Sequence, residues 1–448
     1  MGAKWALTVG AAVTATALAG CGAASSSSSR APRSPARHPA PTIVSERHVA
    51  GTASVVYEWG QFGGGRPRGP ISLTAPRIVE TGSPYGIGPV RRTPQVVRGL
   101  RGTVTQIATS NSDDYALTRA GAVYAWGPGG QGELGDGTRT RLSETAVRVQ
   151  FPAGVRIASL PNPMPYDGGM AVATDGIVWA WGNDRAREFC QARGSIITTP
   201  VAVPLAHVTV AVGALRHALY DTDGRIVSCG DGPLGQLGDG TSGPQARAGT
   251  PVAVRGLPAG RAVALTSGWG DAGVLMADGR YYDWGYNRGG QVGDGTTREA
   301  RTAVAVALPH PVRRVFEGGS FADNGQTLAI LDNGTVWEWG AGEFGQLGDR
   351  GLLDATLPRR LESPPGVHFV AVNSGGSTNY AIDRHAQLWA WGNNRVDQLG
   401  DGSAKRIQRT PVRDPVTVSQ VSSTAHNVAA LARPASGSSP TSARGRSV

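Results

Sequence analysis

The sequence has little helical periodicity, few charged residues and no long apolar segment. No stretch sustains the 3.6-residue apolar repeat of an amphipathic helix, and only 17% of the 448 residues are charged. The apolar run at residues 5–19 is too short to cross a bilayer. By contrast, 65 glycines and 30 prolines indicate many tight turns and short strands. These features favour a compact β protein.

Lysine is almost absent, with only Lys4 and Lys405, so arginine carries nearly all of the positive charge. The formal net charge of +10 is concentrated at the ends of the chain. Residues 1–48 hold five basic residues and one acidic residue, and residues 433–448 add three arginines, which leaves about +3 for the body. Nucleic-acid binding needs basic side chains clustered over the footprint. We therefore expect no nucleic-acid partner.

The sequence also lacks a recognisable catalytic or metal-binding set. It has no nucleophile elbow, no paired Cys and His at a recognisable spacing, and no His and Cys cluster with metal-ligand spacing. Four Asp-Gly loops each contribute one carboxylate, whereas a calcium loop needs several alternating oxygen ligands. We expect no enzyme, no cofactor and no metal, and we interpret these aspartates as turn residues: Asp136, Asp239, Asp294 and Asp401.

The first 50 residues indicate export and a lipid anchor. Lys4 precedes the apolar run, which ends in Leu18-Ala19-Gly20-Cys21. This ending resembles the lipobox of bacterial lipoproteins, in which the cysteine is lipidated and becomes the N-terminus after cleavage. We expect a lipoprotein signal peptide at 1–20 and a lipidated, disordered linker at 21–50, where Ser, Ala, Pro and Arg predominate. Ordinary secretion is the alternative.

What the chain has in abundance is the pair Trp-Gly, which recurs at steps of 48 to 67 residues. Self-similarity at about 50 residues is typical of an array of supersecondary units that stack into one core. There are six copies and one Cys-Gly variant: Trp59-Gly60, Trp126-Gly127, Trp181-Gly182, Cys229-Gly230, Trp284-Gly285, Trp339-Gly340 and Trp391-Gly392.

Each unit reads as four short strands. In the unit 262–306, Asp278-Gly279 lies between the second and third strands, and similar pairs recur at 175–176, 223–224 and 333–334. Such pairs supply the positive φ of a type I′ hairpin turn. After most Trp-Gly pairs comes a glycine-rich loop similar to Gln-Leu-Gly-Asp-Gly, and we expect its apolar residue to fill the gap between neighbouring sheets. In the second unit Phe189 takes that position.

Radially repeated four-stranded sheets form a β-propeller. Inner strand pairs occur at seven places, but the first outer pair, 55–59 with 94–97, precedes all of them. The last inner pair, 416–431, has no outer pair after it. The first outer pair and the last inner pair therefore complete one blade together. We predict one all-β domain at 51–432, a seven-bladed propeller closed by its N-terminal strands, followed by a disordered tail at 433–448.

The Trp-Gly pair, the Asp-Gly turn and the glycine-rich loop resemble the repeat of the regulator of chromosome condensation family. The resemblance covers residues 51–432, and it implies a seven-bladed propeller with strand sharing where the ring closes. The best-known member is a nuclear exchange factor for a small GTPase, a substrate that an exported lipoprotein never meets. One fold hosts unrelated functions, so the resemblance predicts the architecture and leaves the function open.

If Cys21 is lipidated, Cys190 and Cys229 are the remaining cysteines, and they fall in consecutive blades. Export would place them where disulfides form. A disulfide that joins the two blades is one interpretation, and two buried apolar thiols are the alternative.

The loops between the first and second strands vary most, and they share one face of the propeller with the loops between the third and fourth strands. Aromatic and basic side chains among polar ones suit a protein-binding surface. Trp269, between Gly268 and Gly270, is the best candidate for an exposed contact. The candidate residues are Tyr115, Tyr166, His217, Trp269, Phe321, Tyr380 and His426, although several of them could simply cap the blades.

We therefore predict a monomeric, lipid-anchored extracytoplasmic module that binds an unidentified protein partner at the cell envelope. One alternative is a protein similar to the propeller-type β-lactamase inhibitors of soil actinobacteria, which share this repeat, although the repeats here are longer. The other alternative is a cell-wall glycan-binding protein or hydrolase.

Overall fold

In a computed structural model, the protein consists of short β-strands that pair antiparallel with their neighbours. The structure describes residues 55–61, 90–111, 113–191, 194–319, 325–424 and 426–432. The predicted signal peptide, Cys21, the linker, Phe321 and the C-terminal tail lie outside these ranges. Within the described ranges there is no α-helix, and none of their elements is a helix that could cross a membrane.

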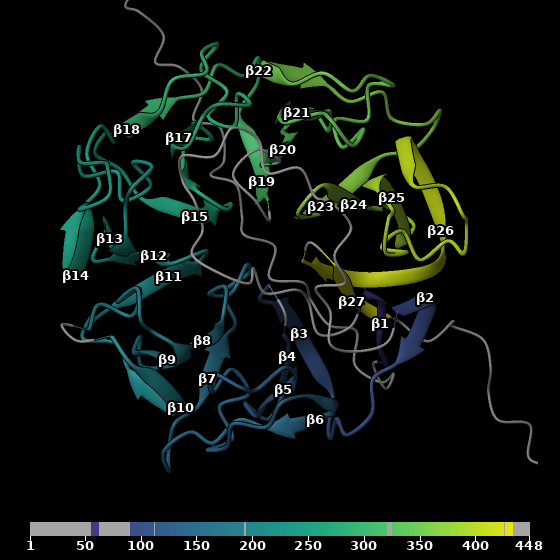
Figure 1. The fold of residues 1–448 in the computed structure, drawn as a ribbon. Helices are drawn as coiled ribbons and strands as arrows, with labels where there is room; N and C mark the ends of the chain where they lie inside the picture. Colours follow the sequence, from purple (N-terminus) through teal and green to yellow (C-terminus); the bar gives the residue numbers. More distant parts are fainter. Residues whose placement is uncertain are drawn as a thin grey trace, which may run out of the picture. The chain divides into compact units, whose positions relative to one another are not determined.

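Five blades are separate four-stranded sheets, each running outwards from the centre of the ring (Figure 1). Blade 1 contains β3 (Val104–Thr109), β4 (Asp114–Thr118), β5 (Val123–Gly127) and β6 (Ser143–Arg148). Blade 2 contains β7 (Ile157–Ser159), β8 (Gly168–Ala173), β9 (Val178–Asn183) and β10 (Ile196–Ala202). Blade 3 contains β11 (Val208–Gly213), β12 (His217–Thr222), β13 (Arg225–Asp231) and β14 (Arg247–Ala253). Blade 4 contains β15 (Ala262–Ser267), β16 (Asp271–Met276), β17 (Tyr281–Gly285) and β18 (Ala300–Ala305). Blade 5 contains β19 (Val312–Gly318), β20 (Gln326–Leu331), β21 (Val336–Gly340) and β22 (Ala355–Arg360).

Blades 6 and 7 form one seven-stranded sheet because a single long strand, β26 (Ile407–Ser423), belongs to both. Its first part pairs with β25 and its last part pairs with β27. The remaining strands are β23 (Phe369–Gly375), β24 (Thr378–Asp383), β25 (Gln387–Asn393), β27 (Asn427–Ala432), β1 (Val55–Gln61) and β2 (Val90–Val96). The N-terminal β1 pairs with β27, with Val55 opposite Ala432 and Gly60 opposite Asn427. The predicted seven blades and the predicted ring closure are confirmed.

The hairpin turns correct one detail of the sequence analysis. Only Asp223-Gly224 has positive φ at both residues, 52° and 74°. At Asp278-Gly279 the glycine alone is positive, and its N–H donates to the Met276 carbonyl at 2.9 Å. This is a type I turn followed by a glycine in the left-handed region. The Asp278 carboxylate accepts the Arg280 N–H at 3.0 Å and favours that geometry. The type I′ prediction is therefore wrong here, and it is wrong for 175–176 and 333–334 for the same reason.

The glycine-rich loops join each blade to the next. Their repeated apolar residue is buried at every position, as predicted: Leu134, Phe189, Leu237, Val292, Leu347 and Leu399. Their aspartates are turn residues, because each accepts the N–H two residues ahead at 2.9 Å: Asp136, Asp239, Asp294 and Asp401.

At most interfaces, the tryptophan of a Trp-Gly pair binds the loop of the preceding blade. Trp339 Nε1, for example, donates to the Gln291 carbonyl at 2.9 Å. The loop can lie this close because Gly293 has a φ of 71°, and an added Cβ would approach Trp339 Nε1 to 2.7 Å. We call this contact the inter-blade tryptophan bond. It recurs at Trp59, Trp181, Trp284 and Trp391.

Two interfaces replace that bond. Between blades 2 and 3, Cys229 stands where the tryptophan would be and forms a disulfide with Cys190 in the loop, with an S–S distance of 2.14 Å. Between blades 7 and 1, Trp126 Nε1 donates to the Glu58 carboxylate at 2.7 Å, and Arg91 pairs with the same carboxylate. Each interface between neighbouring blades is therefore joined by a tryptophan hydrogen bond or by the disulfide.

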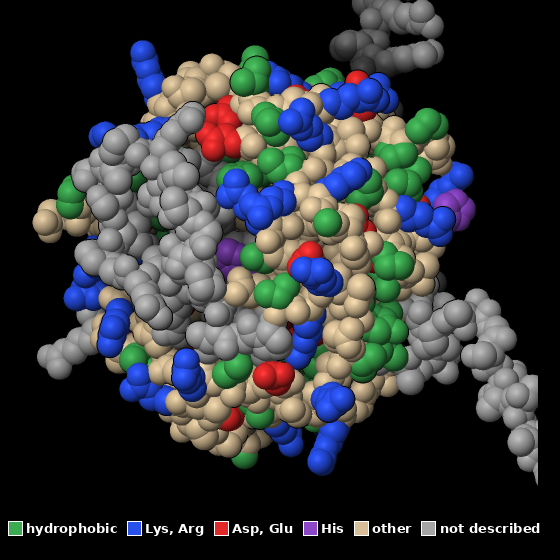
Figure 2. Space-filling view, turned by 45° about the vertical axis from the view of Figure 1, so that its right-hand side comes forward, with side chains coloured by type: hydrophobic (Ala, Val, Ile, Leu, Met, Phe, Trp, Pro, Cys, Tyr) green, Lys and Arg blue, Asp and Glu red, His purple; other side chains and the backbone are tan. Residues whose placement is uncertain are grey.

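The basic side chains do not gather in one patch on the surface in view. Figure 2 shows Lys and Arg side chains spread among acidic and apolar ones. This distribution agrees with the low net charge that the sequence leaves for the body.

Candidate binding site on the axial face

A pocket lies where the loops between the first and second strands converge on the axis of the ring. It is open to solvent, and the empty space at this site, including the solvent at its mouth, is about 480 Å³. All seven blades contribute to its wall, and representatives of blades 1 to 7 in order are Ser110, Tyr166, Leu215, Trp269, Gly319, Gly376 and Thr424. Neighbouring strands of a blade are antiparallel, so the first strand of each blade ends at this face and the second begins there. The same loop of every blade therefore lies on this face.

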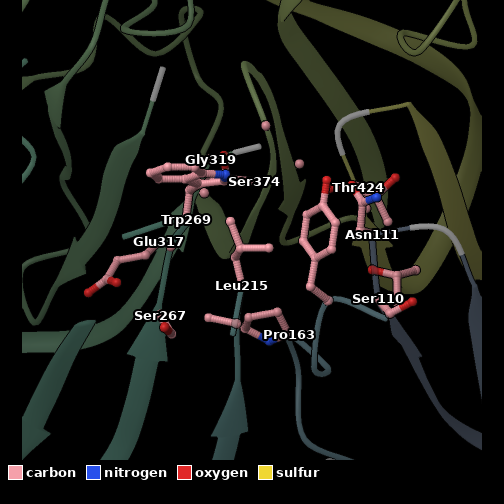
Figure 3. Close-up of a pocket in the computed structure, with 18 of the residues that line it drawn as sticks. Ser110, Asn111, Pro163, Leu215, Ser267, Trp269, Glu317, Gly319, Ser374 and Thr424 are labelled. Atoms are coloured by element: carbon pink, nitrogen blue, oxygen red, sulfur yellow. The ribbon is translucent and has the colours of Figure 1, made fainter. Parts of the chain in front are cut away.

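The pocket wall mixes apolar and polar side chains. Figure 3 shows Ser110, Asn111 and Thr424 on one side, Trp269 and Ser374 across from them, and Leu215 and Pro163 between. Trp269 is only 5% exposed and packs edge-on against Tyr286, with the ring centroids 6.5 Å apart. The Tyr286 ring therefore fixes the position of the indole in the pocket wall.

Several hydroxyl groups in the wall already have partners in a neighbouring blade. Such bonds fix the loops relative to each other and use the hydroxyl proton of each serine, so these hydroxyls can only accept a hydrogen bond from a ligand. The pairs are Ser267 Oγ with His217 Nε2 at 3.0 Å, Ser374 Oγ with Gln326 Nε2 at 2.6 Å, and Ser423 Oγ with Asn373 Oδ1 at 2.5 Å.

His217 lies behind the wall as a neutral imidazole. Burial lowers its pKa to about 4. Its Nδ1 is 3.1 Å from the Leu215 carbonyl, so Nδ1 carries the proton and donates. Nε2 then accepts the proton of the Ser267 hydroxyl. This arrangement has the geometry of a nucleophile and its base, but the low pKa makes the imidazole a weak proton acceptor.

The one acidic residue in the wall, Glu317, turns its carboxyl group away from the pocket and in between blades 4 and 5 (Figure 3). There Oε1 accepts hydrogen bonds from the hydroxyls of Thr266, at 2.5 Å, and Tyr281. Burial raises the pKa of Glu317 to about 7, and it raises the pKa of the adjacent Asp271 well above its usual range. No lysine or arginine is among the described lining residues, so the cavity presents little charge.

Two of the candidate contact residues line the pocket, Tyr166 and Trp269. Tyr166 is half-buried. Trp269 is buried, which corrects the expectation of an exposed contact.

Four other candidates are buried inside the blades and are not accessible on the face. The hydroxyl of Tyr115 donates to the Glu133 carbonyl at 2.9 Å, and that of Tyr380 donates to the Gln398 carbonyl at 2.8 Å. Their position at the start of a second strand directs the rings between sheets, where they support the glycine-rich loops. His217 lies behind Ser267, and burial lowers the pKa of His426 to about 4.

The sequence reasoning missed Leu215 and Pro163 as pocket residues. The signal was available in principle, since both lie in the same loop of the repeat as Trp269 and Tyr166. Neither residue is aromatic or charged, so the pattern typical of binding anchors does not include them.

Comparisons with known proteins agree with the fold. Residues 333–382 match the family model described as the regulator of chromosome condensation (RCC1) repeat. The chain is 26% identical to the human E3 ubiquitin-protein ligase HERC2 over 310 residues, which is 66% of this chain but only 6% of HERC2. It is 27% identical to the ultraviolet-B receptor UVR8 of Arabidopsis thaliana over 329 residues, covering 70% of this chain and 71% of UVR8.

Two solved propellers superimpose on most of the chain. Human WBSCR16 matches with a TM-score of 0.70 and 18% identity, covering 85% of this chain and 99% of that structure. Yeast RCC1 (Prp20) bound to Kap60 matches with a TM-score of 0.70 and 19% identity, covering 86% and 90%. At these identities the likeness extends to the fold alone.

Proposed function

Because the chain is a seven-bladed β-propeller of RCC1 repeats, we propose that it is a monomeric binding module that holds a protein partner at the axial pocket. One observation carries this proposal: loops of all seven blades surround a cavity of little charge, with Trp269 and Leu215 in its wall. Desolvated aromatic and aliphatic pockets are where binding energy concentrates in protein interfaces.

Related propellers support the class of function. Yeast RCC1 (Prp20) was solved with Kap60 bound, and a second structure of Prp20p describes its binding to Gsp1p and histones. UVR8 is a receptor. Those partners belong to those proteins, and the partner of this chain is proposed only as a protein.

The state of the wall hydroxyls favours a protein side chain over a sugar. A sugar ring carries several hydroxyl groups, and each one buried without a partner costs about 1 to 3 kcal/mol. Ser267, Ser374 and Ser423 already hydrogen bond to neighbouring blades. An apolar side chain makes no such demand and can pack against Trp269 and Leu215.

We also propose that the pocket is not catalytic. Ser267 and His217 have the spacing of a nucleophile and base. Activation of the hydroxyl would require the imidazole to accept a proton in a fully buried position, and its pKa of about 4 disfavours this near neutral pH.

Export and lipid anchoring remain part of the proposal. The Leu18-Ala19-Gly20-Cys21 sequence supports lipidation of Cys21. The Cys190–Cys229 disulfide supports an oxidising compartment outside the cytoplasm. The function would then be exerted at the outer side of the cell membrane.

Affinity capture from envelope extracts of the source cells tests the binding site. Leu215→Asp places a charge in the pocket at a half-buried position, so the variant should fold and recover at least about tenfold less of the partner, since an unpaired charge is costly to desolvate. Arg280→Ala, in an exposed turn at the opposite end of blade 4, is the control and should recover as much as wild type. Equal recovery by all three proteins would contradict the site. Recovery of glycan without protein would contradict the class of partner.

Mass spectrometry of the mature protein tests the anchor. We expect an N-terminus at Cys21 that carries lipid, and Cys21→Ser should release the protein from the membrane fraction. An unmodified N-terminus at another residue would contradict the anchor and leave the binding site unaffected.

A further inference from the structure

Two arginines share one buried aspartate at the pocket end of blade 3. Arg216 Nε donates to Asp231 Oδ2 at 2.7 Å, and Arg247 Nε donates to Asp231 Oδ1 at 2.5 Å. The Asp231 side chain is 10% exposed, whereas the two arginine side chains are 49% and 43% exposed. The buried aspartate therefore orients both arginine side chains, and their guanidinium groups remain open to solvent.

Each guanidinium keeps unused donors. A guanidinium has five N–H groups in a planar fork. Arg247 uses only Nε on Asp231, and Arg216 uses Nε and Nη2. Their remaining N–H groups make no hydrogen bond to another described residue. Two forks oriented by one carboxylate can accommodate a second carboxylate, because carboxylates accept parallel N–H bonds from arginine.

The backbone around this pair is rigid and strained. Arg216 has a φ of 64°, in the left-handed region that is unfavourable for a non-glycine residue. Its carbonyl accepts the Asp231 N–H at 2.7 Å. The adjacent loop of blade 2 is tied to β13 by the Cys190–Cys229 disulfide. The side chains are thus held in place before any ligand binds.

The charges nearby favour a single anionic group. An added Cβ on Gly249 would lie 2.9 Å from Arg187 Cδ, so Arg187 lies against β14 two residues from Arg247. The acidic neighbours are Asp231, Glu188, Asp184 and Asp167, and burial raises the pKa of Glu188 well above its usual range and that of Asp184 to about 7. The local balance is modestly positive, far short of the extended basic surface that nucleic acid or an anionic membrane needs.

The site adjoins the pocket directly. Arg216 follows Leu215, which lines the cavity, and Asp231 and Arg247 continue outwards across the same end of blade 3. A partner with an apolar side chain in the pocket would bring its next residues over the two arginines.

We propose that Arg216 and Arg247 form a carboxylate-binding site that receives an Asp or Glu side chain of the protein partner, next to the apolar side chain in the axial pocket. The inference rests on the proposed function. It adds the chemistry of the partner: an acidic group one or a few residues from an apolar one.

The first test uses acetate as the probe. In the full-length protein, the NMR signals of Arg216 and Arg247 Nε–H should shift and saturate at millimolar acetate. Arg301, an exposed arginine paired with the single carboxylate of Glu299, is the matched control and should not saturate in that range. Absence of a difference from Arg301 would overturn the proposal. Saturation by inorganic phosphate but not by acetate would overturn the assignment to a carboxylate.

The second test uses the captured partner. Arg247→Gln leaves Asp231 bound to Arg216, so the fold should be kept, and partner recovery should fall about tenfold and become less sensitive to salt. Arg301→Gln should recover as much as wild type. If Leu215→Asp abolishes recovery while Arg247→Gln does not change it, the proposed function stands and the carboxylate site is rejected.

Discussion

At the scale of single residues, the protein buries several carboxyl groups, and burial raises their pKa values. Asp414 is 1% exposed, and its Oδ1 accepts the Val416 N–H at 3.1 Å. Burial raises its pKa to about 7, and the charge of Asp401 adds to this rise. Asp184, in the altered loop of blade 2, has its pKa raised to about 7 by burial as well.

Asp414→Asn should stabilise the protein at alkaline pH. Because the pKa of Asp414 is raised in the folded state, its contribution to stability is present at low pH and is lost as the pH rises through about 7. The amide keeps the acceptor for Val416 and never ionises. The variant should match wild type near pH 4 and exceed it at pH 8, by roughly 4 kcal/mol at most. Chemical denaturation at both pH values measures this.

The pH dependence of the stability difference distinguishes ionisation of Asp414 from a pH-independent effect of the substitution. A difference that is the same at pH 4 and pH 8 would contradict a role for ionisation. His217 and His426, whose pKa values are lowered, give the opposite slope below about pH 6.5 in both proteins, so only the difference between the proteins is diagnostic.

At the scale of elements, the glycine-rich loop is the part of each repeat that joins neighbouring blades. In blade 5 it contributes Leu347, which is 3% exposed, and Gln346, whose carbonyl accepts Trp391 Nε1 at 2.9 Å. A few residues later, Leu353 is 76% exposed. Two leucines of one loop therefore have opposite environments.

Leu347→Ala should lower the free energy of unfolding by about 2 to 5 kcal/mol, since it removes buried apolar volume between two sheets that cannot close the gap. Leu353→Ala, in the same loop, should change it by no more than about 0.5 kcal/mol. Guanidinium denaturation of both variants checks the pair. Similar losses for both leucines would mean that the loop does not fill the inter-blade gap.

At the scale of the whole molecule, the ring depends on its closure between blades 7 and 1. The first and last of the described strands, β1 and β27, pair there. Here the hydrogen bond from Trp126 Nε1 to the Glu58 carboxylate replaces the inter-blade tryptophan bond. Arg91 on β2 neutralises that carboxylate.

Glu58→Ala should lower stability by about 1 to 3 kcal/mol, since it leaves the buried Trp126 Nε1 without its acceptor and removes one of the carboxylates paired with Arg91, which keeps Glu144. Glu58→Gln should cost less because its amide oxygen still accepts from Trp126. Thermal and chemical denaturation provide the measurement. If the two variants lose the same stability, the hydrogen bond to Trp126 does not contribute to closing the ring.

The architecture could be predicted from the sequence because its determinants are local and repeated. The Trp-Gly pair, the turns and the glycine-rich loops each depend on a few adjacent residues. The offset between inner and outer strand pairs located the closing strand at residues 55–59, and the structure has β1 at Val55–Gln61. Even so, the turn type was wrong where the Asp278 carboxylate stabilised a different local geometry.

The candidate site could be predicted only in outline. The sequence by itself determined the blades, their number and which loops share a face. Only the tertiary structure decided that Tyr115 and Tyr380 are buried, that Trp269 and Leu215 line one pocket, and that Asp231 orients Arg216 and Arg247. The physical reason is that strand pairing follows from short-range pattern, whereas accessibility depends on which blades pack against each other around the ring.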